Sequence, residues 1–194
     1  MKRDLSAEGG LPAQAGFTLV ELLIVVALVI ISAGVTSDII LTLIRSYNKT
    51  RISNEIEQNG NFVILRLERE LRDASNVDTT QSSSTKLVFT ILNAAGAQDT
   101  VTYEVKNVSN GSTNVGSIVR RTTSSPTDVL LTNNSSPEGI AVEVGNDSNP
   151  NFKLIGDNPT VVKINFKMYQ VGAQGSQFTG QTVVRDTIVV RGTY

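Results

Sequence analysis

The chain has 194 residues and a formal net charge of −1, enough for one membrane helix and one modest globular domain. It contains no Cys and no His, which excludes a disulfide-stapled fold and argues against zinc sites and nucleophile–imidazole pairs. The near-neutral charge gives no basic excess that would favour nucleic acid as the main partner. We therefore expect no cofactor, no metal site and no enzymatic activity.

A polar segment of mixed charge opens the chain, and an apolar run with one carboxylate follows it. The apolar run starts at Phe17 and contains Glu21. A charged group at membrane depth costs about 2.5–3.5 kcal/mol on insertion scales, so it usually has a partner. If the chain is cut between Gly16 and Phe17, the new amine lies four residues before Glu21, about one helical turn away. That amine can pair with the carboxylate of its own or of a neighbouring subunit.

The segment Gly16-Phe17-Thr18-Leu19-Val20-Glu21 resembles the N-terminus of type IV pilins and type II secretion pseudopilins, as does the apolar run up to about residue 34. The resemblance implies a prepilin leader, residues 1–16, that prepilin peptidase removes by cutting after Gly16. A residue without a side chain suits that cut because it permits close backbone approach. The resemblance further implies N-methylation of Phe17 and subunit docking through Glu21. Its implied partners are prepilin peptidase, other pilin or pseudopilin subunits and the inner-membrane assembly platform.

Two simpler interpretations of the same residues are a plain single-pass anchor and an uncleaved secretory signal. Residues 17–37 are long enough to span a bilayer, and Lys2 and Arg3 give a short basic start. However, the segment before Gly16 also carries acidic residues, and residues 32–34 only loosely fit a small-residue cleavage site. Neither interpretation explains the carboxylate within the apolar run.

The first apolar segment, residues 17–37, is predicted to be a transmembrane helix that later lies in the core of a fibre. Lys2 and Arg3 should hold the leader on the cytoplasmic side and leave the C-terminal domain outside. The expected location is therefore the cytoplasmic (inner) membrane, in contact with membrane lipid before assembly. After assembly, the resemblance places the chain in a pilus or pseudopilus.

A helix without proline is predicted from residue 17 to about residue 74, with Gly34 and Gly60 as its soft points. Residues 38–75 form its amphipathic continuation, in which apolar residues recur at helical spacing. This stripe consists of Ile52, Ile56, Val63, Leu67 and Leu71. Three (i, i+4) ion pairs are predicted beside it, namely Arg66–Glu70, Glu68–Arg72 and Arg69–Asp73. The repeat is too short and irregular for a coiled coil, so the stripe should pack on a sheet from the same chain.

Residues 76–194 are predicted to form a β-rich extracytoplasmic domain that begins with a linker or loop at residues 79–85. Short runs rich in β-forming residues follow, separated by turn residues. The predicted strands are 86–93, 100–106, 117–122, 128–132, 140–144, 152–155, 161–170 and 182–191. In residues 161–168 the alternation places Val162, Ile164, Phe166 and Met168 on one face. The fold class is thus α+β, with a long N-terminal helix packed on an antiparallel sheet.

Residues 65–74, Leu-Arg-Leu-Glu-Arg-Glu-Leu-Arg-Asp-Ala, followed only by β-rich sequence, resemble J-type pseudopilins and W-type minor pilins. This resemblance implies a structural minor subunit that helps to initiate or cap the fibre. The alternative is a ligand-binding module for DNA uptake or adhesion, carried on a pilin stem. DNA contact could involve Arg120, Arg121, Lys163 or Lys167, but such charges are predicted to be a solvated strand face.

Overall fold

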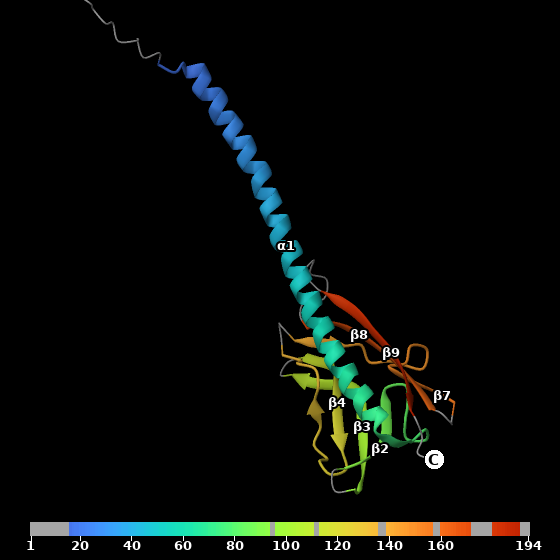
Figure 1. Cartoon of the computed structure of the whole chain (residues 1–194). Helices are drawn as coiled ribbons and strands as arrows, with labels where there is room; N and C mark the ends of the chain where they lie inside the picture. The colour runs from blue at the N-terminus through green and yellow to red at the C-terminus, as the bar shows by residue number, and fades with distance from the viewer. Residues whose placement is uncertain are drawn as a thin grey trace, which may run out of the picture. The chain divides into compact units, whose positions relative to one another are not determined.

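The computed structural model describes residues 16–93, 96–110, 113–135, 139–156, 160–171 and 180–190. The predicted leader up to residue 15, and Arg191 at the end of the last predicted strand, lie outside the described residues. The chain forms two compact units, Met1–Ile44 and Arg45–Tyr194. Helix α1, Leu19–Arg72, begins in the first unit and ends in the second, and strands follow it (Figure 1). The described residues form nine of these strands. This arrangement confirms the predicted α+β class.

Helix α1 ends slightly earlier than the sequence predicts. After Arg72 the chain makes a turn at Asp73 and enters strand β1, Ala74–Val77. The predicted helix overlaps the first part of this strand, and no strand is predicted here. Ala74 and Val77 are both buried in the core, and β1 pairs antiparallel with β2, Lys86–Leu92. Ser75 and Asn76 favour turns and caps over helix interiors, so burial and strand pairing decide the conformation of this segment.

The strands form two sheets. The first, sheet A, has the order β1-β2-β3-β4-β5, where β3 is Gln98–Asn110, β4 is Thr113–Thr122 and β5 is Val129–Leu130. Sheet B is centred on β8, Thr160–Gln170, which pairs antiparallel with β9, Gln181–Val190, along one edge. Two short strands share the other edge of β8, namely β6, Ile140–Val142, and β7, Phe152–Ile155.

Each predicted strand has a counterpart: β7 has its predicted bounds, and the bounds of the others differ by one to four residues at their ends. Strands β3 and β4 are longer than expected because they form one hairpin, in which pairing runs from Val101–Thr122 to Asn110–Thr113. Strands β5 and β6 are shorter than predicted. Residues 79–85 are a loop, as predicted, and hydrogen bonds fix it: the Ser84 carbonyl accepts the N–H groups of Asn151 and Phe152.

The core of the second unit lies between the C-terminal half of α1 and the two sheets (Figure 1). Four residues of the predicted helical stripe are buried there, and Ile52 is half-buried against them. The buried members are Ile56, Val63, Leu67 and Leu71. The core face of β8 is also as predicted, with Val162, Ile164, Phe166 and Met168 all buried. The helix buries Ile64 as well, which the predicted stripe omitted.

At Gly60, helix α1 packs closely against sheet B, and the residue is not a soft point of the helix. The helix continues through it, and the residue is buried. A Cβ atom at this position would lie 2.6 Å from Cγ2 of Val184 in β9 and 3.0 Å from Sδ of Met168 in β8. Only glycine fits at this position, because the backbone of α1 lies directly against sheet B.

The two sheets meet at another glycine. A Cβ atom at Gly116 of β4 would collide with the carbonyl oxygen of Val142 in β6. Because any side chain at this position would separate the strands, glycine permits sheet A and sheet B to share one core.

Candidate functional site

The predicted cleavage junction lies just before the start of α1. Gly16, Phe17 and Thr18 are outside the helix, and Phe17 is 81% exposed. A Cβ atom at Gly16 would meet nothing within 4 Å. The backbone at this junction is therefore open in the part of the chain that the structure describes. Cleavage after Gly16 and methylation of Phe17 remain predictions.

Thr18 caps the N-terminus of α1 and fixes the position of Glu21. The N–H of Glu21 donates to Oγ1 of Thr18 at 3.2 Å, and the N–H of Leu22 donates to the Thr18 carbonyl at 3.1 Å. Glu21 is thus the third residue of the helix, where a carboxylate is stabilised by the positive end of the helix dipole. Thr18 is not among the predicted site residues, although the pattern Thr-x-x-Glu before an apolar run is a capping signal in the sequence itself.

The helix from Leu19 to Ile44 carries its large apolar side chains on every side, and they are exposed. Between Glu21 and Asp38 it has no charged residue. It is long and apolar enough to cross a membrane, by length and composition. Such a surface needs lipid or other apolar helices around it.

Hydroxyl groups in this apolar stretch are satisfied within the helix. The hydroxyl of Ser32 donates to the carbonyl of Leu28, that of Thr36 donates to Ser32 at 2.8 Å, and that of Ser37 donates to Ala33 at 2.8 Å. Each donor thus has an acceptor four residues earlier, so these residues do not bring unpaired polar groups into an apolar environment.

A charge cluster joins the end of α1 to sheet A. The Glu70 carboxylate accepts from Nε of Arg120 at 3.0 Å, from the Tyr103 hydroxyl at 3.0 Å and from Nε of Arg66 at 3.2 Å. The side chains of Glu70 and Arg120 are each 16% exposed, while that of Arg66 is 36% exposed. The predicted pair Arg66–Glu70 is therefore part of a larger, partly buried cluster.

The protonation states of this cluster suit its hydrogen bonds. Burial, and then the Glu70 carboxylate, raise the pKa of the Tyr103 phenol, so its hydroxyl stays protonated and donates. Burial alone would lower the pKa of Arg120, but its hydrogen bond to Glu70 and the charge of that carboxylate outweigh burial and raise the pKa. The arginine thus stays charged.

The prediction that Arg120 lies on a solvated strand face is wrong. It points to the core side of β4 and pairs with Glu70, whereas the more exposed Arg121 lies 3.7 Å from Asp128. Adjacent residues of a strand point to opposite faces, so one of two consecutive arginines had to face the helix. That alternation was the available signal for Arg120.

The other two predicted helix pairs differ in outcome. Glu68–Arg72 forms at 2.5 Å. Asp73 lies beyond the last helical residue, and no ion pair joins it to Arg69 among the described side chains; instead its N–H donates to the Arg69 carbonyl at 3.3 Å.

Glu70→Ala should lower the free energy of unfolding by about 2–4 kcal/mol, because it leaves Arg120 and the Tyr103 hydroxyl without their shared partner. Glu68→Ala is the matched control, since it removes an exposed pair on the same helix and should cost less than about 0.5 kcal/mol. Urea unfolding of the two variants and the parent measures the difference. Equal losses would show that the Glu70 cluster contributes no more than a surface pair.

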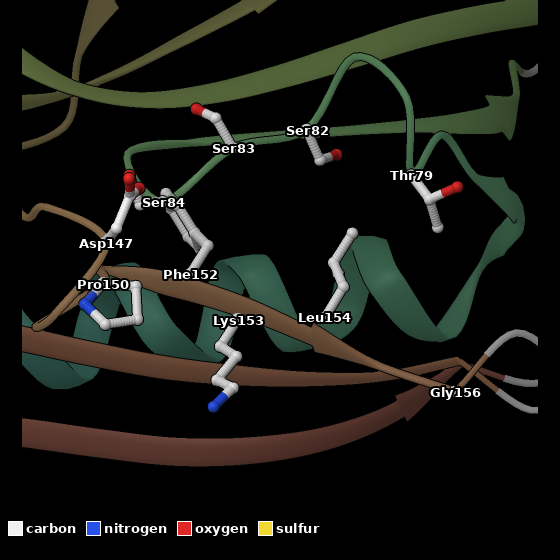
Figure 2. Close-up of a pocket in the computed structure, with 10 residues that line it drawn as sticks. All are labelled: Thr79, Ser82, Ser83, Ser84, Asp147, Pro150, Phe152, Lys153, Leu154 and Gly156. Atoms are coloured by element: carbon white, nitrogen blue, oxygen red, sulfur yellow. The ribbon is translucent and has the colours of Figure 1, made fainter.

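A polar groove of about 400 Å³ lies between the loop after β1 and strand β7 (Figure 2). Its polar lining includes Thr79, Ser82, Ser83, Ser84, Asp147 and Lys153.

Ser82 of the lining and the nearby Asp78 form hydrogen bonds within the loop after β1 and to strand β2. The Ser82 hydroxyl donates to the Asp78 carbonyl at 2.6 Å and accepts the Val88 N–H at 3.0 Å. The Asp78 carboxylate accepts from the Thr80 hydroxyl and then from backbone N–H groups, and these bonds lower its pKa. Among the described residues, no three His, Cys, Asp or Glu side chains gather to hold a metal ion. One wall of the groove is thus a loop held by its own hydrogen bonds.

Residues 11–37 match the family described as the prokaryotic N-terminal methylation motif. The match contains the predicted junction after Gly16, the carboxylate of Glu21 and the apolar helix up to Ser37. It supports a prepilin-type signal and hence the resemblance to pilins and pseudopilins. Comparison with curated proteins and with solved structures gave no match. Because the matched residues end before the β-rich domain, the J-type or W-type assignment stays a prediction.

Proposed function

We propose that this chain is a structural minor pilin or pseudopilin subunit that helps to initiate or cap a type IV pilus or a type II secretion pseudopilus. The observation that carries the proposal is the coincidence of the methylation-motif match, residues 11–37, with an exposed apolar helix near the N-terminus. A plain membrane anchor would account for the apolar helix but would not explain the match to the methylation motif.

Processing is the first step of the proposed mechanism. Prepilin peptidase cuts after Gly16 and the amine of Phe17 is methylated. Lys2 and Arg3 keep the leader on the cytoplasmic side, which leaves the β-rich domain outside. The open backbone around Gly16 supports access by the peptidase.

Assembly is the second step. The apolar helix gains little by associating with others in lipid, whereas in an aqueous fibre the hydrophobic effect holds such helices together. Glu21 sets the register by neutralising the Phe17 amine of an adjacent subunit. The Thr18 cap holds Glu21 in the first turn, close to that amine, which supports this role.

The minor-subunit assignment rests on residues 65–74 and on the domain that follows. The helix ends in the Leu-Glu-x-x-Leu-Arg string, whose Glu70 ties the stem to sheet A. The described part of this domain holds nine strands in two sheets, which supports the large sheet domain that the resemblance to J-type pseudopilins and W-type minor pilins implies.

N-terminal mass spectrometry of the protein purified from a host with prepilin peptidase tests the processing. We expect the chain to begin at a methylated Phe17, and Gly16→Val to retain residues 1–16, because a side chain at the junction blocks close approach of the peptidase. An intact leader in the parent protein, or cleavage near Gly34, would overturn the proposal.

Quantification of the subunits in purified fibres tests the minor role. A subunit that initiates or caps should be present in a few copies per fibre, and its deletion should lower the number of fibres. A copy number equal to that of the shaft subunit would show that the chain is a major subunit.

A further inference from the structure

The face of sheet B that points away from the core carries an unusual row of side chains. Because Val162 and its alternate neighbours face the core, residues 161, 163, 165 and 167 of β8 lie on the opposite face. We call this the outer face of sheet B. The strand registers place residues of β7 and β9 beside them on the same face.

Two lysines lie directly opposite each other on the outer face. Lys153 of β7 and Lys163 of β8 are register partners, and both are exposed. Neither forms an ion pair in the part of the chain that the structure describes. Figure 2 shows Lys153 pointing away from Phe152 and Leu154, as alternation requires. Like charges in directly opposed strand positions destabilise a sheet, so this pair has a cost within the isolated chain.

The positive charge extends to the neighbouring positions. Arg185 of β9 lies opposite Asn165, to which its Nε donates at 3.2 Å, and has no carboxylate partner among the described residues. Lys167 is paired with Glu143 at 2.6 Å. Among the described residues, four cations and one carboxylate thus give the outer face a charge of +3, in a chain whose net charge is −1.

An apolar row lies next to the lysines. Ile155, Val161 and Val189 are register neighbours across β7, β8 and β9. Ile155 is 40% exposed and Val189 is 51% exposed. Exposed aliphatic side chains beside cations suit a protein surface, whereas phosphate backbones are bound by cations and polar groups.

We propose that the outer face of sheet B docks an acidic patch on a different protein subunit of the same fibre, with the apolar row at the edge of the contact. This inference rests on the proposed function. A partner carboxylate between Lys153 and Lys163 would remove their repulsion, which is the complementarity that fixes the register of protein interfaces. Two copies of this positively charged face would repel each other in a symmetric contact, so an acidic surface on a different subunit is the more complementary partner.

Photo-crosslinking of the full chain in its native membranes tests this docking face. A photoreactive amino acid replaces Thr187, which is exposed and lies opposite Lys163 on the outer face. We expect a crosslink to a different prepilin-type chain, at a peptide that contains Asp or Glu. The double variant Lys153→Glu with Lys163→Glu should lower the yield at least tenfold, and high salt should lower it in the parent. Lys86→Glu, the same charge change on sheet A, should leave the yield unchanged.

Other crosslinks would overturn the proposal: to a second copy of this chain, to a phospholipid or to nucleic acid. Absence of any crosslink, or an equal yield in the double variant, would overturn it as well. Leader cleavage after Gly16 should proceed normally in the lysine variants. Failure of cleavage in the parent would therefore refute the proposed function, whereas normal cleavage without the crosslink would refute only the docking face.

Thermal unfolding of the purified full chain in detergent separates lost docking from misfolding. The single variant Lys153→Glu replaces a repulsive cross-strand pair with an attractive one, so its Tm should rise by about 1–3 °C while its crosslink yield falls. A lower Tm would show that the lysines do not repel each other, and that docking was lost through damage to the fold.

Discussion

Leu67→Asp should lower the free energy of unfolding of the second unit, Arg45–Tyr194, by more than about 4 kcal/mol and leave it unfolded at room temperature. Leu67 is fully buried between α1 and the sheets. The substitution removes its apolar contacts and places a carboxylate in the core without a partner. Circular dichroism and urea unfolding of a fragment beginning at Arg45 measure the loss.

Leu65→Asp is a matched control for this experiment. Leu65 lies two residues earlier on the same helix and is 62% exposed, so the same chemical change there should alter the free energy of unfolding by less than about 0.5 kcal/mol. A Leu67→Asp fragment as stable as the Leu65→Asp fragment would mean that the helix does not cover the sheets.

Glu21→Ala should reduce incorporation into the fibre or its tip complex at least tenfold while leaving insertion and leader cleavage intact. Removal of a carboxylate from an apolar helix makes insertion easier, and the peptidase reads mainly the junction after Gly16. In the assembled fibre, however, the amine of a neighbouring Phe17 would lose its counter-charge in a low-dielectric setting. Crosslinking in membranes and counting of fibres measure the two steps separately.

The control for Glu21 is Glu57→Ala, which changes an exposed carboxylate on α1 outside the apolar segment. It should assemble like the parent. If Glu21→Ala assembled equally well, Glu21 would not be a docking residue, and the capped helix would serve as an anchor alone.

The parts of the fold that could be predicted are those that local periodicity determines. The helical spacing from Ile52 to Leu71 predicted which face of α1 is buried, and the alternation from Val162 to Met168 predicted the core face of β8. Both patterns report directly which side chains avoid water. For the N-terminal site, Gly16, Phe17 and Glu21 could be named because the motif is contiguous in sequence.

The parts that could not be predicted depend on contacts between distant residues. Glu70 lies 50 residues before Arg120, so nothing local could distinguish their pairing from a surface pair on the helix. Strand β1 has only four residues, and it forms because it pairs with β2 and buries side chains in the core. Gly60 is predicted to be a soft point because glycine lowers helix propensity. The helix nevertheless continues through it, because sheet B approaches so closely that only glycine fits.

The two contacts of α1 at Gly60 and Glu70 have a mechanical consequence. Gly60 meets sheet B and Glu70 is bound to sheet A, and ten helical residues separate them, about 15 Å along the axis. A pulling force along the axis of α1 would act on both contacts in shear. The helix therefore cannot slide past one sheet without also breaking its contact with the other. Under such a force, both sheets would therefore move as one body with the C-terminal half of α1.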